Sequence, residues 1–147
     1  MVTPVFRSSE FQRKRVFNAP GLAVAVVIAL LLGTGSPSAA LPTARIHDCY
    51  DGDTCTTSTG EKIRLACIDS PELRGKRAEP AAAQAARDYL RSIVANQEVG
   101  IQRITTDRYG RTVAELFVGG SNVQQMLVAE GAARIDWKHA HQCSWTR

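Results

Sequence analysis

The sequence lacks an apolar run long enough to cross a membrane, and residues 41–147 contain no internal repeat or low-complexity tract. The longest unbroken apolar run, residues 22–32, has 11 residues, against the roughly 20 that a membrane-spanning helix requires. The chain also lacks a Cys-x-x-Cys pair, and His47 and His139 are not spaced from the cysteines as zinc ligands are. These absences argue against a membrane span and a zinc module, and 147 residues leave room for one domain.

Net charge is small once the N-terminal segment is set aside. The whole chain has a formal charge of +4 and an isoelectric point of about 9.1. Residues 1–40 contribute four basic residues and one acidic residue, so the remainder has 14 basic and 13 acidic residues, a net charge of about +1. Any binding of nucleic acid by residues 41–147 must therefore depend on local patches of charge.

Residues 1–40 have the organisation of a secretory signal peptide. A basic stretch ends at Arg15, the apolar run covers 22–32, and small or turn-forming residues continue to Ala40. We predict cleavage after Ala40 and a secreted or periplasmic protein with no stable membrane association after cleavage. Because the basic region is long, an uncleaved, membrane-anchored N-terminus is the alternative.

The cysteine pattern agrees with export. All four cysteines follow the predicted cleavage site, at Cys49, Cys55, Cys67 and Cys143. An even number of cysteines in a short exported chain predicts two disulfides. Four cysteines allow three pairings, and the sequence does not choose among them. Cys67 lies in an apolar segment, where a small buried hydrophobic residue is an alternative role.

Alternating apolar residues bounded by turn signals predict five strands, at residues 43–49, 54–57, 63–68, 99–104 and 112–118. Residues 73–77 form a charged loop. An apolar stripe predicts a helix between the third and fourth strands, with members Ala86, Tyr89, Leu90, Ile93 and Val94. Pro80 fits the first turn of this helix, where a missing N–H costs little.

A second helix follows the fifth strand. Ser121 or Asn122 can cap its N-terminus, Val123 and Leu127 are among its apolar residues, and Gly131 ends it. The order of elements is then β-β-β-α-β-β-α. This order predicts an α+β, mainly β fold, namely a five-stranded OB-type Greek-key barrel with two helices.

Two acidic segments are suited to a hard metal ion. Asp51 and Asp53 flank Gly52 in a predicted turn, where alternate carboxylates on a tight loop can converge on one point. A plain Asp-Gly hairpin turn is the alternative. Asp69 is placed at the end of the third predicted strand, two residues before Pro71, and an Asp that caps a turn is again the alternative.

Two arginines could bind phosphate. Arg64 lies among apolar residues of the third predicted strand, where a guanidinium is costly to desolvate unless an anion meets it. The alternative is an arginine that extends along a solvated strand face. Arg111 precedes the fifth strand, and Asp107 could pair with it or with Arg108 in an ordinary surface salt bridge. Carboxylates, a metal ion and guanidinium groups together favour cleavage of a phosphodiester.

The chain resembles the thermonucleases, the secreted micrococcal-nuclease-like (SNase-like) enzymes with an OB-type barrel. The resemblance covers roughly residues 43–138 and three ordered motifs. These motifs are Asp51-Gly52-Asp53-Thr54, Arg64-Leu65 with Ile68-Asp69-Ser70-Pro71-Glu72, and Asp107-Arg108-Tyr109-Gly110-Arg111-Thr112-Val113-Ala114. It implies hydrolysis of DNA and RNA with Ca²⁺.

The resemblance also implies a metal site. Asp53 and Asp69 would be side-chain ligands of Ca²⁺, and Asp51 would lie near the ion and tune the site. Ser70 stands where the family usually has threonine and would offer its backbone carbonyl, so that difference should be tolerated. Calcium is a hard cation that prefers oxygen ligands, which agrees with this set.

The remaining implied roles are catalysis and substrate binding. Glu72 matches the residue that activates or orients the attacking water, and Arg64 and Arg111 match the pair that grips the scissile phosphate. Further substrate-binding residues are Tyr109, Trp137 and His139. The last two stand where the family has tyrosines, and a tryptophan can still stack on a base.

A third helix found in the best-known members does not fit after Cys143, and a disulfide from Cys143 could hold the short tail instead. We therefore expect a monomeric exported nuclease acting on DNA, RNA or both. The alternatives are a non-catalytic OB-fold module of the cell envelope that binds nucleic acid or protein, and a disulfide-stapled structural domain whose carboxylates only serve turns.

Overall fold

The computed structural model describes residues 40–147, so the predicted signal peptide lies outside the described residues except for Ala40. The strands are β1 Thr43–Cys49, β2 Thr54–Thr57, β3 Lys62–Leu65, β4 Ile68–Asp69, β5 Glu98–Thr106, β6 Thr112–Val118, β7 Ser121–Asn122 and β8 Arg134–Ile135. The helices are α1 Pro80–Val94 and α2 Val123–Ala129, followed by the 3₁₀ turns η1 Ala140–Gln142 and η2 Ser144–Thr146. No helix in this part of the chain combines the length and apolar character that a membrane span needs.

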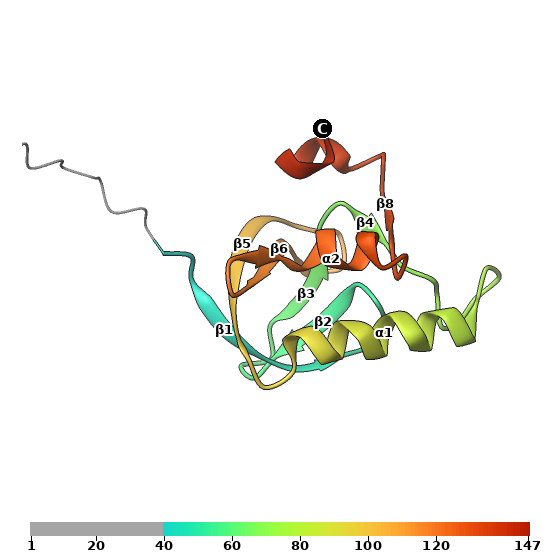
Figure 1. Cartoon of the computed structure of the whole chain (residues 1–147), viewed down its shortest axis with the longest axis horizontal. Coiled ribbons are helices and arrows are strands. Elements are labelled where there is room, and N and C mark those ends of the chain that lie inside the picture. Colours follow the sequence, from blue (N-terminus) through green and yellow to red (C-terminus); the bar gives the residue numbers. More distant parts are fainter. Residues whose placement is uncertain (1–39) are drawn as a thin grey trace, which may run out of the picture. The chain divides into compact units, whose positions relative to one another are not determined.

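Five strands close into a barrel (Figure 1). β1 pairs antiparallel with β2 and with β5, β2 with β3, and β5 with β6. A parallel pairing of β3 with β6, from Ile63↔Thr112 to Leu65↔Ala114, closes the ring. The predicted fold, an α+β, mainly β OB-type barrel of five strands with two helices, is confirmed.

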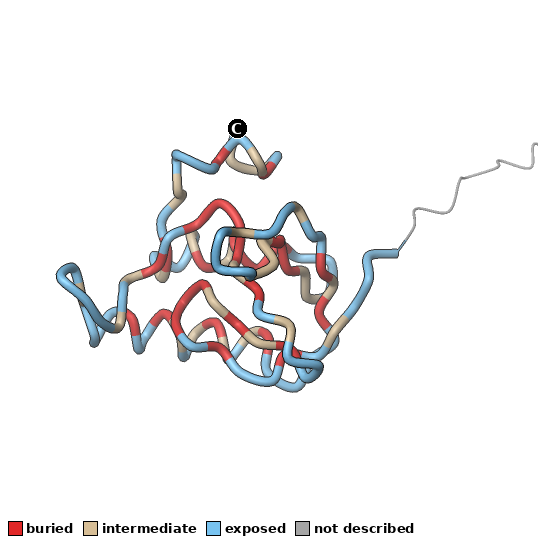
Figure 2. The backbone as a smooth tube through the Cα atoms, turned by 180° about the vertical axis from the view of Figure 1, so that it is seen from behind, coloured by how far each residue is buried: buried red, intermediate tan, exposed pale blue. Residues whose placement is uncertain are grey.

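Buried residues alternate with less buried ones along β2 and β3, and Figure 2 colours the buried stretches of the backbone red. Ile63, Leu65, Ile101 and Leu116 are all fully buried. Helix α1 begins with Pro80 at its first position and buries one face, made of Ala83, Ala86, Leu90 and Val94. It packs against β1 and α2, and α2 in turn packs against β6. The side of the barrel that α1 covers is therefore closed to ligands.

The predicted strand at residues 63–68 is wrong in its second half. β3 ends at Leu65, and Cys67 has a backbone φ of 64°, in the left-handed region that a strand does not use. The chain then forms β4, which pairs with β8 through Ile68↔Ile135 and Asp69↔Arg134. The apolar alternation alone does not show this break. As a result, Asp69 leaves the barrel on a separate two-stranded ladder.

Two disulfides are present, as predicted. One joins Cys49 and Cys55 across the β1–β2 hairpin, and the other joins Cys67 to Cys143 over a separation of 76 residues. All four cysteines are therefore bonded, which excludes the zinc alternative. The prediction that a disulfide from Cys143 holds the tail is confirmed. The helical elements of the described segment after β8 are the two 3₁₀ turns.

Candidate active site

The turn between β1 and β2 is held tightly against the rest of the domain. A Cβ atom on Gly52 would lie 2.8 Å from the Cβ atoms of both Ala86 and Ser70, which is closer than real contacts allow. Only glycine therefore lets the turn lie against α1 and the segment after β4. The flanking residues Asp51 and Asp53 are both buried as a result.

The Asp53 carboxylate is fixed by three donors. Its Oδ2 accepts a hydrogen bond from the Ser70 backbone N–H at 2.9 Å, and its Oδ1 accepts one from the Thr54 hydroxyl at 3.1 Å. Arg64 contributes an ion pair at 3.3 Å to Oδ2. The carboxylate thus has one orientation, and the segment Asp69–Ser70 is tied to the first turn across 17 residues of sequence.

The carboxyl of Asp51 is in a different electrostatic state. Burial, followed by the nearby negative charge of Asp53, raises the pKa of Asp51 from 3.8 to about 6. Its Oδ1 accepts a hydrogen bond from the Asp53 backbone N–H at 3.1 Å, which partly offsets this rise. The Asp51 carboxyl therefore loses its proton less readily than an ordinary aspartate, and a cation near it would favour its ionised form.

Arg64 lies between the two acidic segments. Its guanidinium Nη2 is 3.3 Å from Asp53 Oδ2 and 3.6 Å from Asp69 Oδ1, while Nη1 donates to the Leu65 carbonyl at 2.7 Å. The side chain is 19% exposed, so it is not an arginine extended along a solvated face. The carboxylates of Asp53 and Asp69 hence approach the same point of positive charge, as a shared site requires.

Arg111 is held on the other side of Arg64 by Asp107. Its Nε donates to Asp107 Oδ2 at 2.8 Å, and its backbone N–H donates to Oδ1 at 3.0 Å. Burial raises the pKa of the Asp107 carboxyl, but the hydrogen bonds from Arg111 and from the Tyr109 N–H outweigh it and hold the pKa below its ordinary value. The salt bridge considered from the sequence therefore forms with Arg111, and it fixes the direction of the guanidinium.

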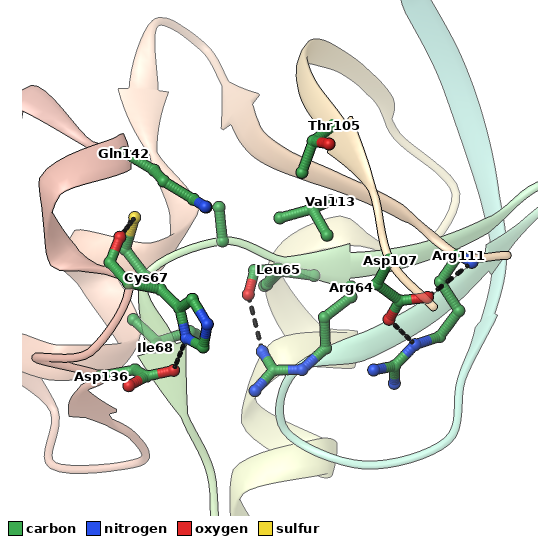
Figure 3. Close-up of a pocket in the computed structure, with 12 residues that line it drawn as sticks. Arg64, Leu65, Cys67, Ile68, Thr105, Asp107, Arg111, Val113, Asp136 and Gln142 are labelled. Carbon is green, nitrogen blue, oxygen red and sulfur yellow. Dashed lines mark hydrogen bonds and ion pairs between the residues drawn. The ribbon is translucent and has the colours of Figure 1, made fainter. Parts of the chain in front are cut away.

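Arg64 and Arg111 line one cavity of about 340 Å³, which we call the arginine cavity. Figure 3 shows Arg64 between the Asp107–Arg111 pair and Asp136. Other lining residues are His139, Gln142 and the apolar residues Leu65, Ile68 and Val113. The volume lies in the range of small-ligand pockets, and the cavity presents two guanidinium groups together with the carboxylates of Asp107 and Asp136.

Glu72 belongs to a second, neighbouring space of about 210 Å³, the carboxylate hollow. It is lined by Asp69, Ser70, Glu72, Arg77, Glu79 and Arg134. Because the Asp69 carboxylate also contacts Arg64, the two spaces meet at this ion pair. Glu72 itself is exposed, and its backbone closes the base of the 72–79 loop through the Glu72↔Ala78 bridge and a 2.9 Å hydrogen bond from the Glu79 N–H.

The fit to a metal ion is partial. No group of three or more His, Cys, Asp or Glu side chains within residues 40–147 is arranged to hold a metal ion. Asp53 and Asp69 nevertheless converge on one cationic nitrogen of Arg64, with Asp51 two residues from Asp53. Two carboxylates and nearby backbone oxygens suit a hard cation that completes its coordination with water or substrate.

The three predicted substrate-binding residues lie in different surroundings. The Tyr109 ring is exposed and faces the guanidinium groups of Arg108, at 4.7 Å, and Arg111, at 5.6 Å. His139 lines the arginine cavity. Trp137 is 73% exposed and is not among the residues that line the cavity. The structure therefore brings Tyr109 and His139 to the two arginines and leaves Trp137 on the open surface.

Two residues of the site had no predicted role. The Thr54 hydroxyl, which donates to Asp53, also accepts a 3.3 Å hydrogen bond from Arg111 Nη1. Asp136 Oδ2 and His139 Nδ1 form a 2.6 Å hydrogen bond. A signal existed for Asp136, since it stands three residues before His139, but that spacing is common in turns.

Comparison with known proteins agrees with this geometry. The family described as Staphylococcal nuclease homologue matches residues 62–144. An Escherichia coli O157:H7 protein named "Uncharacterized endonuclease" is 33% identical over 95 residues, which are 62% of this chain and 59% of that protein. A Haemophilus influenzae (strain ATCC 51907 / DSM 11121 / KW20 / Rd) protein of the same name is 32% identical over 103 residues, 67% of this chain and 55% of that protein.

The aligned segments span less than two thirds of the length of these relatives. The family match includes β3 with Arg64, the Asp69–Glu72 segment, the Asp107–Arg111 turn and the tail to Ser144. The family match thus covers more than half of the sequence and lies within the barrel domain described above. The chain belongs to the staphylococcal nuclease homologue family.

Proposed function

We propose that this chain is a Ca²⁺-dependent nuclease that hydrolyses phosphodiester bonds in DNA, RNA or both. The observation that carries the proposal is the position of Arg64, which contacts Asp53 and Asp69 and also shares the arginine cavity with Arg111. Acidic groups for a cation and basic groups for a phosphate therefore meet at one side chain. The names of the Escherichia coli and Haemophilus influenzae relatives support this choice.

The chain's own residues divide the work between binding and proton transfer. Arg64 and Arg111 present planar N–H donors to the phosphate oxygens, on which negative charge grows in the transition state. Glu72 accepts a proton from the attacking water and orients it. The exposed rings of Tyr109 and Trp137 offer faces on which nucleotide bases stack.

Asp53, Asp69 and the Ser70 backbone carbonyl would hold Ca²⁺, with Asp51 near it. The bound ion would supply polarisation of the phosphoryl group. Arg64 is paired with the same two carboxylates, so its guanidinium lies beside the groups that would hold the ion.

The test uses purified protein with linear DNA and with RNA, in Ca²⁺ and then in excess EGTA. We expect degradation in Ca²⁺ and none in EGTA. Degradation that EGTA leaves unchanged would contradict the metal role. Retained binding without any degradation would instead favour a non-catalytic OB-fold module.

Replacement of the proposed base makes the test specific. Glu72→Gln removes the proton acceptor but keeps the size of the side chain, so we expect turnover to fall by about 10²- to 10⁴-fold. Binding of a DNA oligonucleotide in EGTA should change little, because Glu72 is not among the residues of the arginine cavity. Glu130→Gln, an exposed substitution at the end of α2, is the matched control. A loss below tenfold would remove Glu72 from the mechanism.

We also propose export to an oxidising compartment and action as a monomer. Two disulfides that use all four cysteines support the first point, because such bonds persist outside the reducing cytosol. Mass spectrometry of the extracellular or periplasmic protein would test cleavage after Ala40 and the oxidation state together. A full-length product with four free thiols would contradict the proposal.

A further inference from the structure

The Asp136–His139 pair has no part in the function proposed above beyond general substrate contact, yet several hydrogen bonds hold it in place. The Asp136 backbone N–H donates to the Cys67 carbonyl at 2.9 Å, and its Oδ1 accepts from the Lys138 N–H at 3.1 Å. Asp136 Oδ2 lies 2.6 Å from His139 Nδ1. The turn after β8 is thus fastened to the barrel, and the imidazole is fastened to the turn.

The state of Asp136 fixes which ring nitrogen is free. Burial raises the pKa of its carboxyl, but the hydrogen bond from His139 and the positive charges of His139 and Arg64 outweigh burial and lower the pKa overall. An ionised carboxylate only accepts hydrogen bonds, so His139 Nδ1 carries the proton. Among residues 40–147, Nε2 then has no hydrogen-bond partner, on a side chain that is 47% exposed and lines the arginine cavity.

The charged residues that line the cavity with the His139 imidazole come from three segments of the chain. Arg64 comes from β3, Asp107 and Arg111 come from the β5–β6 turn, and Asp136 precedes the ring on its own segment. The two guanidinium groups supply N–H donors that a phosphate can bind, and His139 lines the same cavity. Asp136 holds the imidazole in place through its hydrogen bond to Nδ1.

His139 and Glu72 lie in different spaces. Glu72 lines the carboxylate hollow, His139 lines the arginine cavity, and the two spaces meet where Asp69 contacts Arg64 at 3.6 Å. In phosphoryl transfer the attacking and leaving oxygens lie roughly in line, on opposite sides of the phosphorus. Glu72 and His139 therefore reach the neighbourhood of Arg64 from two different spaces, which is the separation that a base and an acid acting on opposite oxygens of one phosphate would need.

We propose that His139, positioned by Asp136, is the general acid that protonates the leaving oxygen, an inference that depends on the proposed nuclease function. The water oxygen forms a bond to phosphorus as the bond from phosphorus to the leaving oxygen breaks. The leaving oxygen keeps that electron pair and takes the Nε2 proton of the imidazolium, while Glu72 takes the proton of the water. Exchange of protons with solvent then restores both groups.

The test compares two leaving groups in Ca²⁺. One substrate is a DNA oligonucleotide, whose leaving alkoxide needs a proton, and the other is a mononucleotide p-nitrophenyl phosphodiester, whose nitrophenolate does not. We expect His139→Gln to lower kcat on DNA by about 10²- to 10³-fold but to lower nitrophenolate release only a few-fold, about the size of a lost hydrogen bond. Asp136→Asn should show the same substrate-dependent pattern with a smaller loss, as a positioning residue.

Two further measurements separate chemistry from folding. His141→Gln, on η1 and outside the lining of the cavity, is the matched control and should cleave both substrates at the normal rate. Free imidazole should restore DNA cleavage to His139→Ala, which it would not do for a misfolded protein. Melting temperatures of all variants should agree with that of the unchanged protein, because the ring is half exposed.

The outcomes are distinct. Equal losses on both substrates, or no rescue by imidazole, would overturn the acid role and leave His139 as a binding residue. Normal DNA cleavage by His139→Gln would overturn the inference while the nuclease proposal stands. If the unchanged protein cleaves neither substrate in Ca²⁺, the proposed function and this inference both fall.

Discussion

At the scale of single residues, one hydroxyl connects the two halves of the site. Thr54 donates to Asp53 Oδ1 and accepts from Arg111 Nη1, so a single oxygen joins a buried carboxylate to an arginine of the arginine cavity. Thr54 is the first residue of β2, and its backbone position is therefore set by the barrel. A shift of this residue would move both charged groups together.

Thr54→Val tests this connection. Valine keeps the branched shape that suits a strand but cannot hydrogen-bond, and we expect kcat/KM on DNA to fall about tenfold, the equivalent of one hydrogen bond. Thr54→Ser keeps the hydroxyl and should stay close to the unchanged rate. An equal loss in both variants would show that the methyl group matters and not the hydroxyl.

Asp51 predicts a pH dependence for the Ca²⁺-free protein. Because its pKa is raised from 3.8 to about 6, the folded state holds this proton more tightly than the unfolded chain does. The free energy of unfolding should therefore fall as pH rises through that window and stay level above it. Asp51→Asn removes this cost and can still accept the hydrogen bond from the Asp53 N–H.

We expect Asp51→Asn in EGTA to be more stable than the unchanged protein at pH 8 by on the order of 2 kcal/mol. The difference should shrink toward zero near pH 3, below the ordinary pKa of 3.8, where the carboxyl is largely protonated in both states. Denaturant unfolding at the two pH values measures it. A difference that is the same at both would show that Asp51 is ionised without penalty.

The sequence predicted some residue contacts and not others, for a physical reason. Asp53, Asp69 and Arg64 were expected in one site because they lie in short ordered motifs, although as metal ligands and a phosphate-binding residue and not as ion-pair partners. The position of Asp136 depends instead on its backbone bond to the Cys67 carbonyl, 69 residues away along the chain. No local pattern encodes such a contact, so the partner of His139 was missed.

At the scale of elements, helix α2 is fastened to β6 by a buried glutamine. Gln124 is 0% exposed, its Oε1 accepts from the Leu116 N–H at 3.1 Å, and its Nε2 donates to the Ala114 carbonyl at 2.9 Å. The side chain thus hydrogen-bonds β6 directly, sharing the Ala114 carbonyl with the Ala66 N–H, which lies 2.9 Å from the same oxygen. Asn122 caps the same helix by accepting from the Gln125 N–H, one of the two caps expected from the sequence.

Gln124→Ala would leave the Leu116 N–H of β6 without a partner, whereas the Ala114 carbonyl keeps its bond from the Ala66 N–H. We expect the free energy of unfolding to fall by about 2 kcal/mol, since an unsatisfied buried group costs on the order of 1 to 3 kcal/mol. The neighbouring Gln125→Ala is the control, because that side chain is exposed. Similar stability of the two variants in urea would contradict the role given to Gln124.

Strand bounds were predictable where apolar alternation and turn residues agree. Residues 43–49, 54–57 and 112–118 form the strands expected, and α1 begins at Pro80. Residues 63–68 alternate equally well but are interrupted at Cys67, whose left-handed backbone is stabilised by tertiary bonding and not by its own preference. Local patterns therefore overextended β3 and misplaced the strand that carries Asp69.

At the scale of the whole described domain, the Cys67–Cys143 disulfide holds the tail that carries Asp136 and His139. It closes a loop of sequence separation 76, whereas Cys49–Cys55 closes one of separation 6. In the chain-entropy account, a longer loop restricts the unfolded chain more strongly. Its loss should also loosen the wall of the arginine cavity.

Cys67→Ser with Cys143→Ser should cost about 4 kcal/mol of unfolding free energy, against about 2 kcal/mol for Cys49→Ser with Cys55→Ser. The first double variant should also lose more DNA cleavage at a temperature where both remain folded. Thermal melts and rates in Ca²⁺ measure the two effects. Equal losses from both pairs would contradict a special role for the tail.

Barrel closure itself could be expected only from the order of elements. Antiparallel neighbours such as β1 and β2 are joined by short turns and follow from local signals. The parallel β3–β6 pairing joins segments about 50 residues apart, and no local pattern specifies its register. The order β-β-β-α-β-β-α supplied the architecture, but the register had to come from the structure.

The pinched base of the 72–79 loop has a consequence for how this scaffold can vary. The Glu72↔Ala78 bridge and the bond from the Glu79 N–H to the Glu72 carbonyl hold both ends of the loop together, while its tip around Gly75 is exposed. Insertions, deletions or a grafted recognition peptide at the tip would leave the carboxylate at its base in place. The tip of the loop could thus change which polymers it contacts, while the position of Glu72 stays the same.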